Sequence, residues 1–185
     1  MRIFIIHGWY GSPKGDWVPW LASQLKSKGC EVITPEMPDT DNPKITPWVN
    51  KLKEAVGEPR LDDILIGHSI GCQTILRFFE TLDDSAKIAK VIFVAPWVKL
   101  ANLSSKKEWE IAEPWLETPI DFSNIKNKAK SFVALFSDSD EWVHLEDNVK
   151  IFREKLNSKV VILKNKGHFD ESSGIKELPE ILEYI

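Results

Sequence analysis

The stretch "DDILIGHSIGCQTILRFF", residues 62–79, decides the fold of this chain. A short aliphatic run is followed by Ser69 between two glycines, Gly67 and Gly71, and then by a segment whose apolar side chains recur every three or four positions. The run is typical of a buried strand and the segment of an amphipathic helix. We therefore expect a strand that turns into a helix at a serine, flanked by residues that tolerate almost any backbone angle.

Five similar aliphatic runs occur along the chain, with helical periodicity between them. Near-continuous apolarity, rather than strict alternation, marks strands that are covered on both faces of a parallel sheet. The alternation predicts a doubly wound α/β domain, with about six parallel strands flanked by helices and a ligand site at the carboxyl ends of the strands. The predicted strands are residues 3–6, 31–34, 64–66, 91–95, 131–136 and 160–163.

Two of the predicted helices have recognisable ends. Asp16 is placed to cap the first helix, which Gly29 would end. Thr46, with Pro47 in the first turn, would start the second helix, which Gly57 would end. Further helices are expected at residues 145–156 and 175–185.

The composition fits a single globular domain. The chain has 185 residues, enough to bury a sizeable core without disulfides. Its apolar and charged fractions, 43% and 28%, are ordinary, and its formal net charge of −4 offers no basic face for nucleic acid.

Two cysteines without a paired framework indicate a reduced, cytoplasmic protein. No apolar run is long enough for a signal segment or a membrane span, and a monomer or weak homodimer is expected.

Residues 97–130 form the longest link between predicted strands. The link is rich in Trp, Pro, Ser and Lys and shows one or two weak helical turns. Long links in compact domains are usually functional or mobile. We expect this segment to form a small lid beside the site. The alternative is a segment that packs on the surface of the protein and does not act as a lid.

The pentapeptide "GHSIG", residues 67–71, has the spacing G-x-S-x-G between a strand and a helix. Side chains two positions before and after a serine at such a turn would collide, and glycines remove the collision. The helix that follows directs its free N–H groups and its positive dipole end at the serine oxygen. This placement favours a catalytic nucleophile as the role of Ser69. The alternative is a structural role, in which the serine only caps the helix.

A serine hydroxyl is a poor nucleophile near neutral pH without a base. In chains with this turn, an acid and then a histidine follow later strands. His168 comes directly after the sixth predicted strand and is the candidate base. The other three histidines are weaker candidates for the base. His7 ends the first predicted strand, His68 adjoins the serine, and His144 begins a helix.

Two acids follow the fifth predicted strand, Asp138 and Asp140. Asp140 is preferred because a hydrophobic residue stands three positions after it, where the chain turns into the next helix. Asp138 is the alternative, and the acid that is not used would cap or brace the loop.

Backbone N–H groups and aromatic side chains complete the predicted site. Acyl transfer needs two N–H donors for an oxyanion. One candidate is Ile70, directly after the serine. The other belongs to the loop after the first strand, which contains two glycines: Trp9 is the first choice and Tyr10 the second. Tyr10, Trp97 and Trp142 follow strand ends and are candidates for pocket walls, although core packing is the commoner role of any tryptophan. Such a pocket would suit short acyl groups.

The blocks "HGWYGSPKGDWVPWL", "IGHSIGCQTILRF", "SDSDEWVH" and "NKGHFDESSGIKELPEI" together resemble the small single-domain serine hydrolases of the α/β-hydrolase superfamily, relatives of the retinoblastoma-binding serine hydrolase. The resemblance covers nearly the whole chain. It implies a reduced α/β-hydrolase fold and a triad of Ser69, Asp140 and His168. Family members usually have proline after the acid, and Glu141 stands there in this chain, so the choice between Asp138 and Asp140 stays open. The motif L-x-C-x-E is absent, so the retinoblastoma protein is not expected as a partner.

These patterns predict an enzyme that cleaves small carboxylic esters, or amides, through an acyl-enzyme and without a cofactor. The alternative is a non-catalytic protein-interaction module on a hydrolase scaffold. A dinucleotide site is not predicted, because "GHSIG" is not G-x-G-x-x-G. A metal site is not predicted either, for want of clustered ligands.

Overall fold

Six parallel strands form the centre of the protein in the computed structural model, which describes residues 1–185. The sheet has the order β2-β1-β3-β4-β5-β6, and every neighbouring pair is parallel. The predicted doubly wound sheet is therefore confirmed, with each predicted strand found. The strands are β1 (Arg2–Ile6), β2 (Glu31–Ile33), β3 (Ile64–His68), β4 (Ile88–Val94), β5 (Ala129–Ser137) and β6 (Lys159–Leu163).

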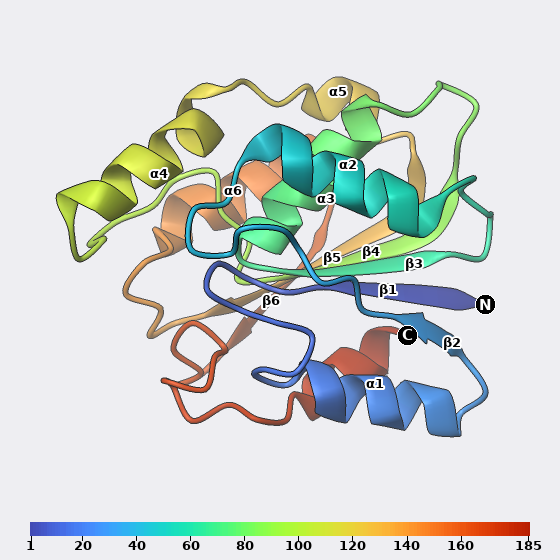
Figure 1. Ribbon diagram of the computed structural model, residues 1–185, viewed down its shortest axis with the longest axis horizontal. Helices are drawn as coiled ribbons and strands as arrows, with labels where there is room; N and C mark the ends of the chain where they lie inside the picture. Colours follow the sequence, from blue (N-terminus) through green and yellow to red (C-terminus); the bar gives the residue numbers. More distant parts are fainter.

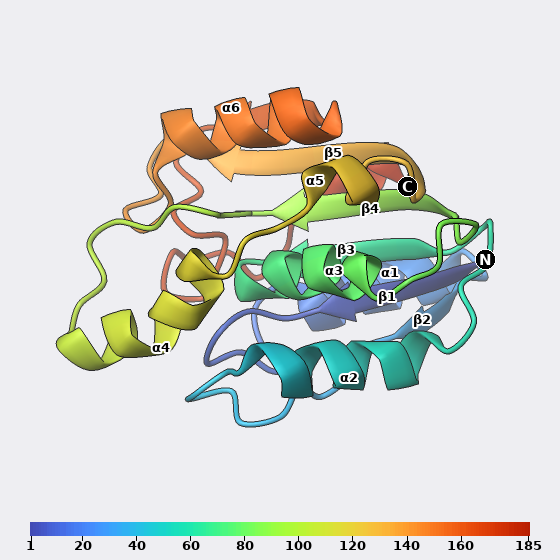
Figure 2. The ribbon, with the colours of Figure 1, turned by 90° about the horizontal axis from the view of Figure 1, so that it is seen from above.

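Helices cover both faces of the sheet (Figures 1 and 2). One face carries α1 (Val18–Ser27) and the C-terminal 3-10 helix η1 (Pro179–Tyr184). The other carries α2 (Ile45–Val56), α3 (Ile70–Glu80), α5 (Phe122–Ile125) and α6 (Leu145–Leu156), while α4 (Lys106–Glu117) lies beyond the carboxyl ends of the strands. The carboxyl edge of the sheet is thus surrounded by loops and one helix.

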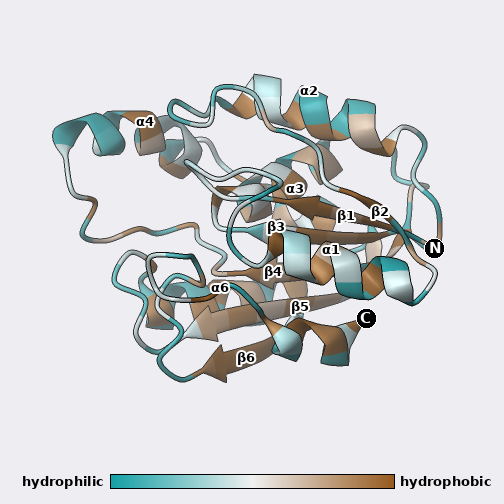
Figure 3. Cartoon of the chain, turned by 60° about the horizontal axis from the view of Figure 1, so that its bottom comes forward, coloured by the Kyte–Doolittle hydropathy of each residue, from teal (hydrophilic) through white to brown (hydrophobic).

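The core explains why the strands read as nearly continuous apolar runs. Residues 3–6 of β1 are fully buried, and β3 is buried along its whole length because helices lie on both sides of it. Figure 3 shows mainly apolar strands between helices in which hydrophilic and hydrophobic residues alternate. The fold therefore places its two most buried strands beside the turn that carries Ser69.

The turn at Ser69 depends on very close packing. Ser69 has a left-handed backbone, with φ 52° and ψ −119°, which is strained for a residue other than glycine. A Cβ atom on Gly71 would lie 2.4 Å from the carbonyl oxygen of Ile6, and one on Gly67 would lie 2.8 Å from the N atom of Cys72. The two glycines of the motif are therefore required by backbone contacts, as the sequence suggested.

The positions predicted for the starts of the first two helices were less accurate than those predicted for the strands. Helix α1 begins at Val18 and Asp16 does not cap it, because the Asp16 carboxylate accepts a hydrogen bond from the Glu171 N–H instead. Helix α2 begins one residue before Thr46, with no side-chain cap. The predicted stop at Gly57 is confirmed, since this residue is the C-cap of α2.

The C-terminal helix predicted at residues 175–185 is wrong in type and extent. A 3-10 helix spans only Pro179–Tyr184. Pro179 disfavours the helical conformation in the residue before it, and Leu178 accordingly lies outside the helical region, with φ −136° and ψ 70°.

Residues 97–130 are more regular than the sequence indicated. Helix α4 has 12 residues and starts with a capping box, in which Ser105 and Glu108 each accept a hydrogen bond from the other's N–H. Its buried Trp115 donates a hydrogen bond from Nε1 to the Pro43 carbonyl at 2.9 Å, which ties α4 to the loop before α2. The lid-like role of this insertion stays a prediction.

We expect Gly71→Ala to lower the free energy of unfolding by at least about 3 kcal/mol, because the new methyl group would meet a backbone oxygen that cannot move alone. Urea unfolding followed by circular dichroism measures this. Gly15→Ala is the control, since a Cβ there would lie 3.6 Å from its nearest neighbour, the Ser12 hydroxyl. Equal stability of the two variants would contradict the packing argument.

Candidate active site

The strand-to-helix turn holds Ser69 at the carboxyl edge of the sheet. Its N–H donates to the Val94 carbonyl at 2.9 Å, which fixes the turn to β4. The Ser69 hydroxyl oxygen accepts a hydrogen bond from Trp97 Nε1 at 3.3 Å. The serine is 7% exposed, so its hydroxyl is largely shielded from water.

Trp97 reaches the serine through a sharp change of direction after β4. Ala95 has a left-handed φ of 47°, and its N–H donates to the Leu135 carbonyl. Gln73 of α3 donates a hydrogen bond from Nε2 to the Trp97 carbonyl at 2.9 Å. The backbone around Trp97 is therefore held from both β5 and α3, and the residue is 1% exposed.

His168 and Asp140 form a pair that is largely shielded from water. His168 Nδ1 lies 2.8 Å from Asp140 Oδ2, and the side chains are 11% and 3% exposed. The other carboxylate oxygen of Asp140 accepts from the N–H groups of Trp142 and Val143. The Trp142 ring packs edge-on against the imidazole, with centroids 5.0 Å apart. The position of the imidazole is therefore fixed on two sides.

The loops after β5 and β6 are joined by four consecutive side chains. Ser137, Asp138 and Ser139 accept hydrogen bonds from N–H groups of the loop after β6, and Asp140 contacts the imidazole itself. The acceptor and donor pairs are Ser137 with Lys166 at 3.1 Å, Asp138 with Asn165 at 2.8 Å, Ser139 with Gly167 at 3.1 Å and Asp140 with His168 at 2.8 Å. Asp138 thus braces the loop, and Asp140 is the acid that faces the imidazole.

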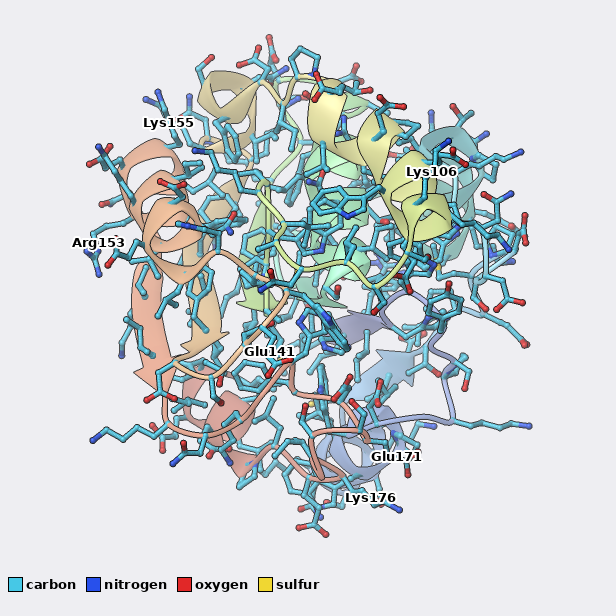
Figure 4. All side chains as sticks on the ribbon, turned by 90° about the vertical axis from the view of Figure 1, so that its left-hand side faces the viewer. Lys106, Glu141, Arg153, Lys155, Glu171 and Lys176 are labelled. Carbon is cyan, nitrogen blue, oxygen red and sulfur yellow. The ribbon has the colours of Figure 1, made fainter.

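Ser69 and His168 line one cavity of about 530 Å³ at the carboxyl edge, the edge that faces the viewer in Figure 4. No hydrogen bond joins the two side chains in this conformation. The pocket candidates Tyr10, Trp97 and Trp142 all line the cavity. The other lining residues are Gly8, Trp9, Gly11, Ser12, Gly15, Asp16, His68, Leu100, Leu103, Ser104, Glu108, Asp170, Glu171 and Ser172.

The loop after β1 carries both residues predicted as its oxyanion donor, Trp9 and Tyr10. The N–H of Tyr10 donates to the Thr40 carbonyl at 3.0 Å, so it is not available to a ligand. The N–H groups of Trp9 and Ile70 make no hydrogen bond within the protein. His7 holds the loop, since its Nδ1–H donates to the Gly8 carbonyl while its Nε2 accepts from a backbone N–H. Of the predicted donors, Trp9 and Ile70 are free.

His68 has a structural role that the sequence did not indicate. Its Nε2 lies 2.8 Å from the His168 carbonyl oxygen, and because that oxygen only accepts, Nε2 carries the proton. Nδ1 has no hydrogen-bond partner, with Asp16 Oδ2 at 3.8 Å. Burial, and then the charge of a protonated His168, lower the pKa of His68. His68 is therefore a neutral support for the backbone of His168.

None of the helices has the length and apolarity that crossing a membrane requires. Cys30 and Cys72 are both free thiols, and burial raises the pKa of Cys72 far above its ordinary value. A thiol with such a pKa is an inert part of the core.

A parallel sheet of this order with a serine at the strand-to-helix turn after its third strand defines an α/β-hydrolase fold. Comparison with known families gives the same result, because the serine hydrolase family model matches residues 3–185. The chain belongs to the serine hydrolase family.

Several known proteins are similar over the whole chain. YdeN of Bacillus subtilis (strain 168) is 25% identical over 184 residues, which cover 100% of this chain and 94% of YdeN. Its crystal structure superposes with a TM-score of 0.89 and 26% identity, covering 99% of this chain and 95% of the other. Est1E of Butyrivibrio proteoclasticus with bound ferulic acid has a TM-score of 0.71 at 16% identity and covers 98% of this chain and 88% of its own, a likeness of fold.

We expect stability to fall as the pH is lowered from about 7.5 to 5. A histidine with a lowered folded pKa contributes full stability above its unfolded pKa, and this is lost as the pH falls, because only the unfolded chain takes up the proton. Burial lowers the pKa of both His68 and His7 from 6.5. Each would add a slope of up to about 1.4 kcal/mol per pH unit.

Urea unfolding at several pH values, with His68→Gln, measures the contribution of His68. The glutamine keeps a donor for the His168 carbonyl and removes the titration, so the slope between pH 7.5 and 5 should decrease. His144→Gln is the control, because the His144 side chain is 53% exposed and should not change the slope. A slope unaltered by His68→Gln would show that His68 is not held neutral.

Proposed function

We propose that this protein hydrolyses small carboxylic esters, or amides, through an acyl-enzyme on Ser69. The observation that carries the proposal is the 2.8 Å contact between His168 Nδ1 and Asp140 Oδ2, in a cavity that Ser69 also lines. An acid that holds one imidazole nitrogen leaves the other free to act as a base toward a serine. The positions support the roles of nucleophile, base and orienting acid.

In the first step Ser69 Oγ attacks the substrate carbonyl carbon. The Nδ1–H of His168 donates to Asp140, so Nε2 has a free lone pair that can accept the hydroxyl proton. The Asp140 carboxylate stabilises the imidazolium that forms and stays ionised itself. The free enzyme has no Ser69 to His168 hydrogen bond, and such bonds often form only when substrate binds.

The attack places negative charge on the former carbonyl oxygen. The free N–H groups of Trp9 and Ile70 are the donors proposed for this oxyanion, and Ile70 is the first residue of α3, where the helix dipole is positive. One such donor is typically worth about 3 to 4 kcal/mol of barrier. His168 then gives its proton to the leaving group, and water attacks the acyl-enzyme by the same route in reverse.

Trp97 adds a donor that acts on the nucleophile itself. Its Nε1–H already points at Ser69 Oγ, so Oγ keeps its own proton for the base. The oxygen carries partial negative charge while it attacks and again when it leaves the acyl-enzyme. The indole N–H would stabilise both transition states, because a hydrogen bond to a charged group is stronger than one to a neutral group.

The cavity and the relatives support a small substrate. A volume of about 530 Å³ lies within the usual range for small-molecule sites, and aromatic walls suit short acyl groups. Est1E binds ferulic acid, and the similar structure from Nitrososphaera gargenis belongs to a study of carboxylesterases. Both have the fold at low identity, so they support the reaction class and leave the substrate open.

We expect a fluorophosphonate probe to label the wild-type protein and not Ser69→Ala. Hydrolysis of 4-nitrophenyl acetate should fall by about 10³- to 10⁴-fold in kcat for Asp140→Asn, because the amide favours the wrong imidazole tautomer. Asp138→Asn is the matched control, since its remaining oxygen can still accept from Asn165 and turnover should change little. Absence of labelling in folded wild-type protein would favour the interaction module instead.

We expect Trp97→Phe to lower kcat by about ten- to a hundredfold with little change in KM, through loss of the N–H donor to Ser69 Oγ. Trp142→Phe is the control, because phenylalanine keeps an aromatic edge against His168, and its kcat should stay within about threefold. Steady-state kinetics with 4-nitrophenyl acetate measures both. Equal losses in the two variants would indicate packing alone.

A further inference from the structure

The cavity walls carry charge of one sign. Among the lining residues are four carboxylates and no lysine or arginine. Figure 4 shows this face of the molecule, with Glu141 near its middle and Glu171 and Lys176 close together below it. A cleft lined by one sign of charge raises the local concentration of oppositely charged ligands and disfavours like-charged ones.

Two of these carboxylates, Asp16 and Asp170, have no lysine or arginine partner. Asp16 Oδ1 accepts the Glu171 N–H, and its Oδ2 faces only His68, which burial keeps neutral. Burial raises the pKa of Asp170, but hydrogen bonds from the Ser173 and Ser172 hydroxyls outweigh this, and the pKa lies below its ordinary value. Glu171 differs, because Lys176 lies 2.9 Å from it. The uncompensated negative charge therefore lies inside the cavity.

An exposed aromatic pair stands in the same cavity. Tyr10 has a left-handed φ of 57° and is 57% exposed, while its ring stacks on Trp9 with centroids 5.5 Å apart. Both conformation and exposure are unfavourable for a large aromatic residue. The Glu108 carboxylate lines the same cavity as this ring, and burial and then the negative charge of Glu108 raise the pKa of the Tyr10 phenol.

An aromatic face next to a carboxylate is the arrangement that binds organic ammonium ions. The second oxygen of Glu108 is free for this, because the capping hydrogen bond uses only Oε2. No arginine or lysine fills the place between the ring and the carboxylate, since neither type lines the cavity. The pair is thus without an internal cation.

We propose that the Trp9–Tyr10 stack and Glu108 bind a positively charged ammonium group of the substrate, so that the enzyme prefers cationic esters or amides to neutral ones and rejects anionic ones. This inference rests on the proposed hydrolase function. It names the chemical class of substrate that the same cavity would take.

Three acetate esters of nearly equal size test the charge preference. Acetylcholine and 3,3-dimethylbutyl acetate differ only in a quaternary nitrogen or carbon, and 2-sulfoethyl acetate carries a negative charge. Each kcat/KM is divided by the rate constant for hydroxide hydrolysis of the same ester, which removes differences in intrinsic reactivity. We expect the corrected value to be about tenfold higher for acetylcholine than for the neutral ester, and lowest for the sulfonate.

Glu108→Gln locates the effect. Glutamine keeps the capping box of α4, so the fold should be retained while the ratio of corrected kcat/KM for acetylcholine to that for 3,3-dimethylbutyl acetate drops severalfold. Glu110→Gln is the matched control, because Glu110 lies on the same helix, pairs with Lys106 at 3.5 Å and does not line the cavity. The wild-type preference should also shrink as salt is raised from about 0.01 to 1 M.

The outcomes separate this inference from the proposed function. Hydrolysis of the neutral ester with equal or lower corrected activity on acetylcholine would overturn the ammonium site and leave the hydrolase intact. A preference that Glu108→Gln does not reduce would also overturn it. No hydrolysis of any ester, together with no fluorophosphonate labelling, would overturn the hydrolase proposal itself.

Discussion

The contact between α3 and the end of β1 is the constraint on which the rest of this structure depends. A hydrogen is the largest group that Gly71 can place beside the Ile6 carbonyl, because a Cβ there would lie 2.4 Å from that oxygen. This approach lets β3 turn straight into α3 and holds Ser69 in a left-handed conformation at the tip. The strain at Ser69 is maintained because buried strands on both sides leave the turn no other path.

A second set of contacts makes the loops after β5 and β6 one unit. These strands are neighbours in the sheet, so their carboxyl ends lie side by side. The side chains of residues 137–139 accept hydrogen bonds from the three N–H groups of residues 165–167, and the next residue of each loop, Asp140 and His168, then face each other. The acid and imidazole are therefore positioned by backbone hydrogen bonds, and the loop can be precise without regular secondary structure.

Charge links this architecture to the choice of ligand. The buried histidines next to the site, His7 and His68, are kept neutral by burial, so neither offsets the carboxylates of the cavity. Helix α4 adds Glu108 from outside the sheet to the wall of the cavity that Tyr10 also lines. The sheet edge thus supplies the proposed chemistry, whereas the insertion after β4 contributes to the charge that a substrate would meet.

The sequence alone determined the six strands, their parallel arrangement and the strained turn at Ser69. Burial on both faces of the sheet requires continuous apolar runs, and the close backbone contacts at the turn require glycine, so both constraints are visible in the local sequence. It also limited the proposed acid to Asp138 or Asp140. Only the tertiary structure decided which of these faces His168, why Asp16 does not cap α1, and that Trp97 contacts the serine oxygen. These outcomes depend on which groups from segments far apart in the chain come into contact. The spacing of residues along the sequence does not give the distances between such groups in the folded protein.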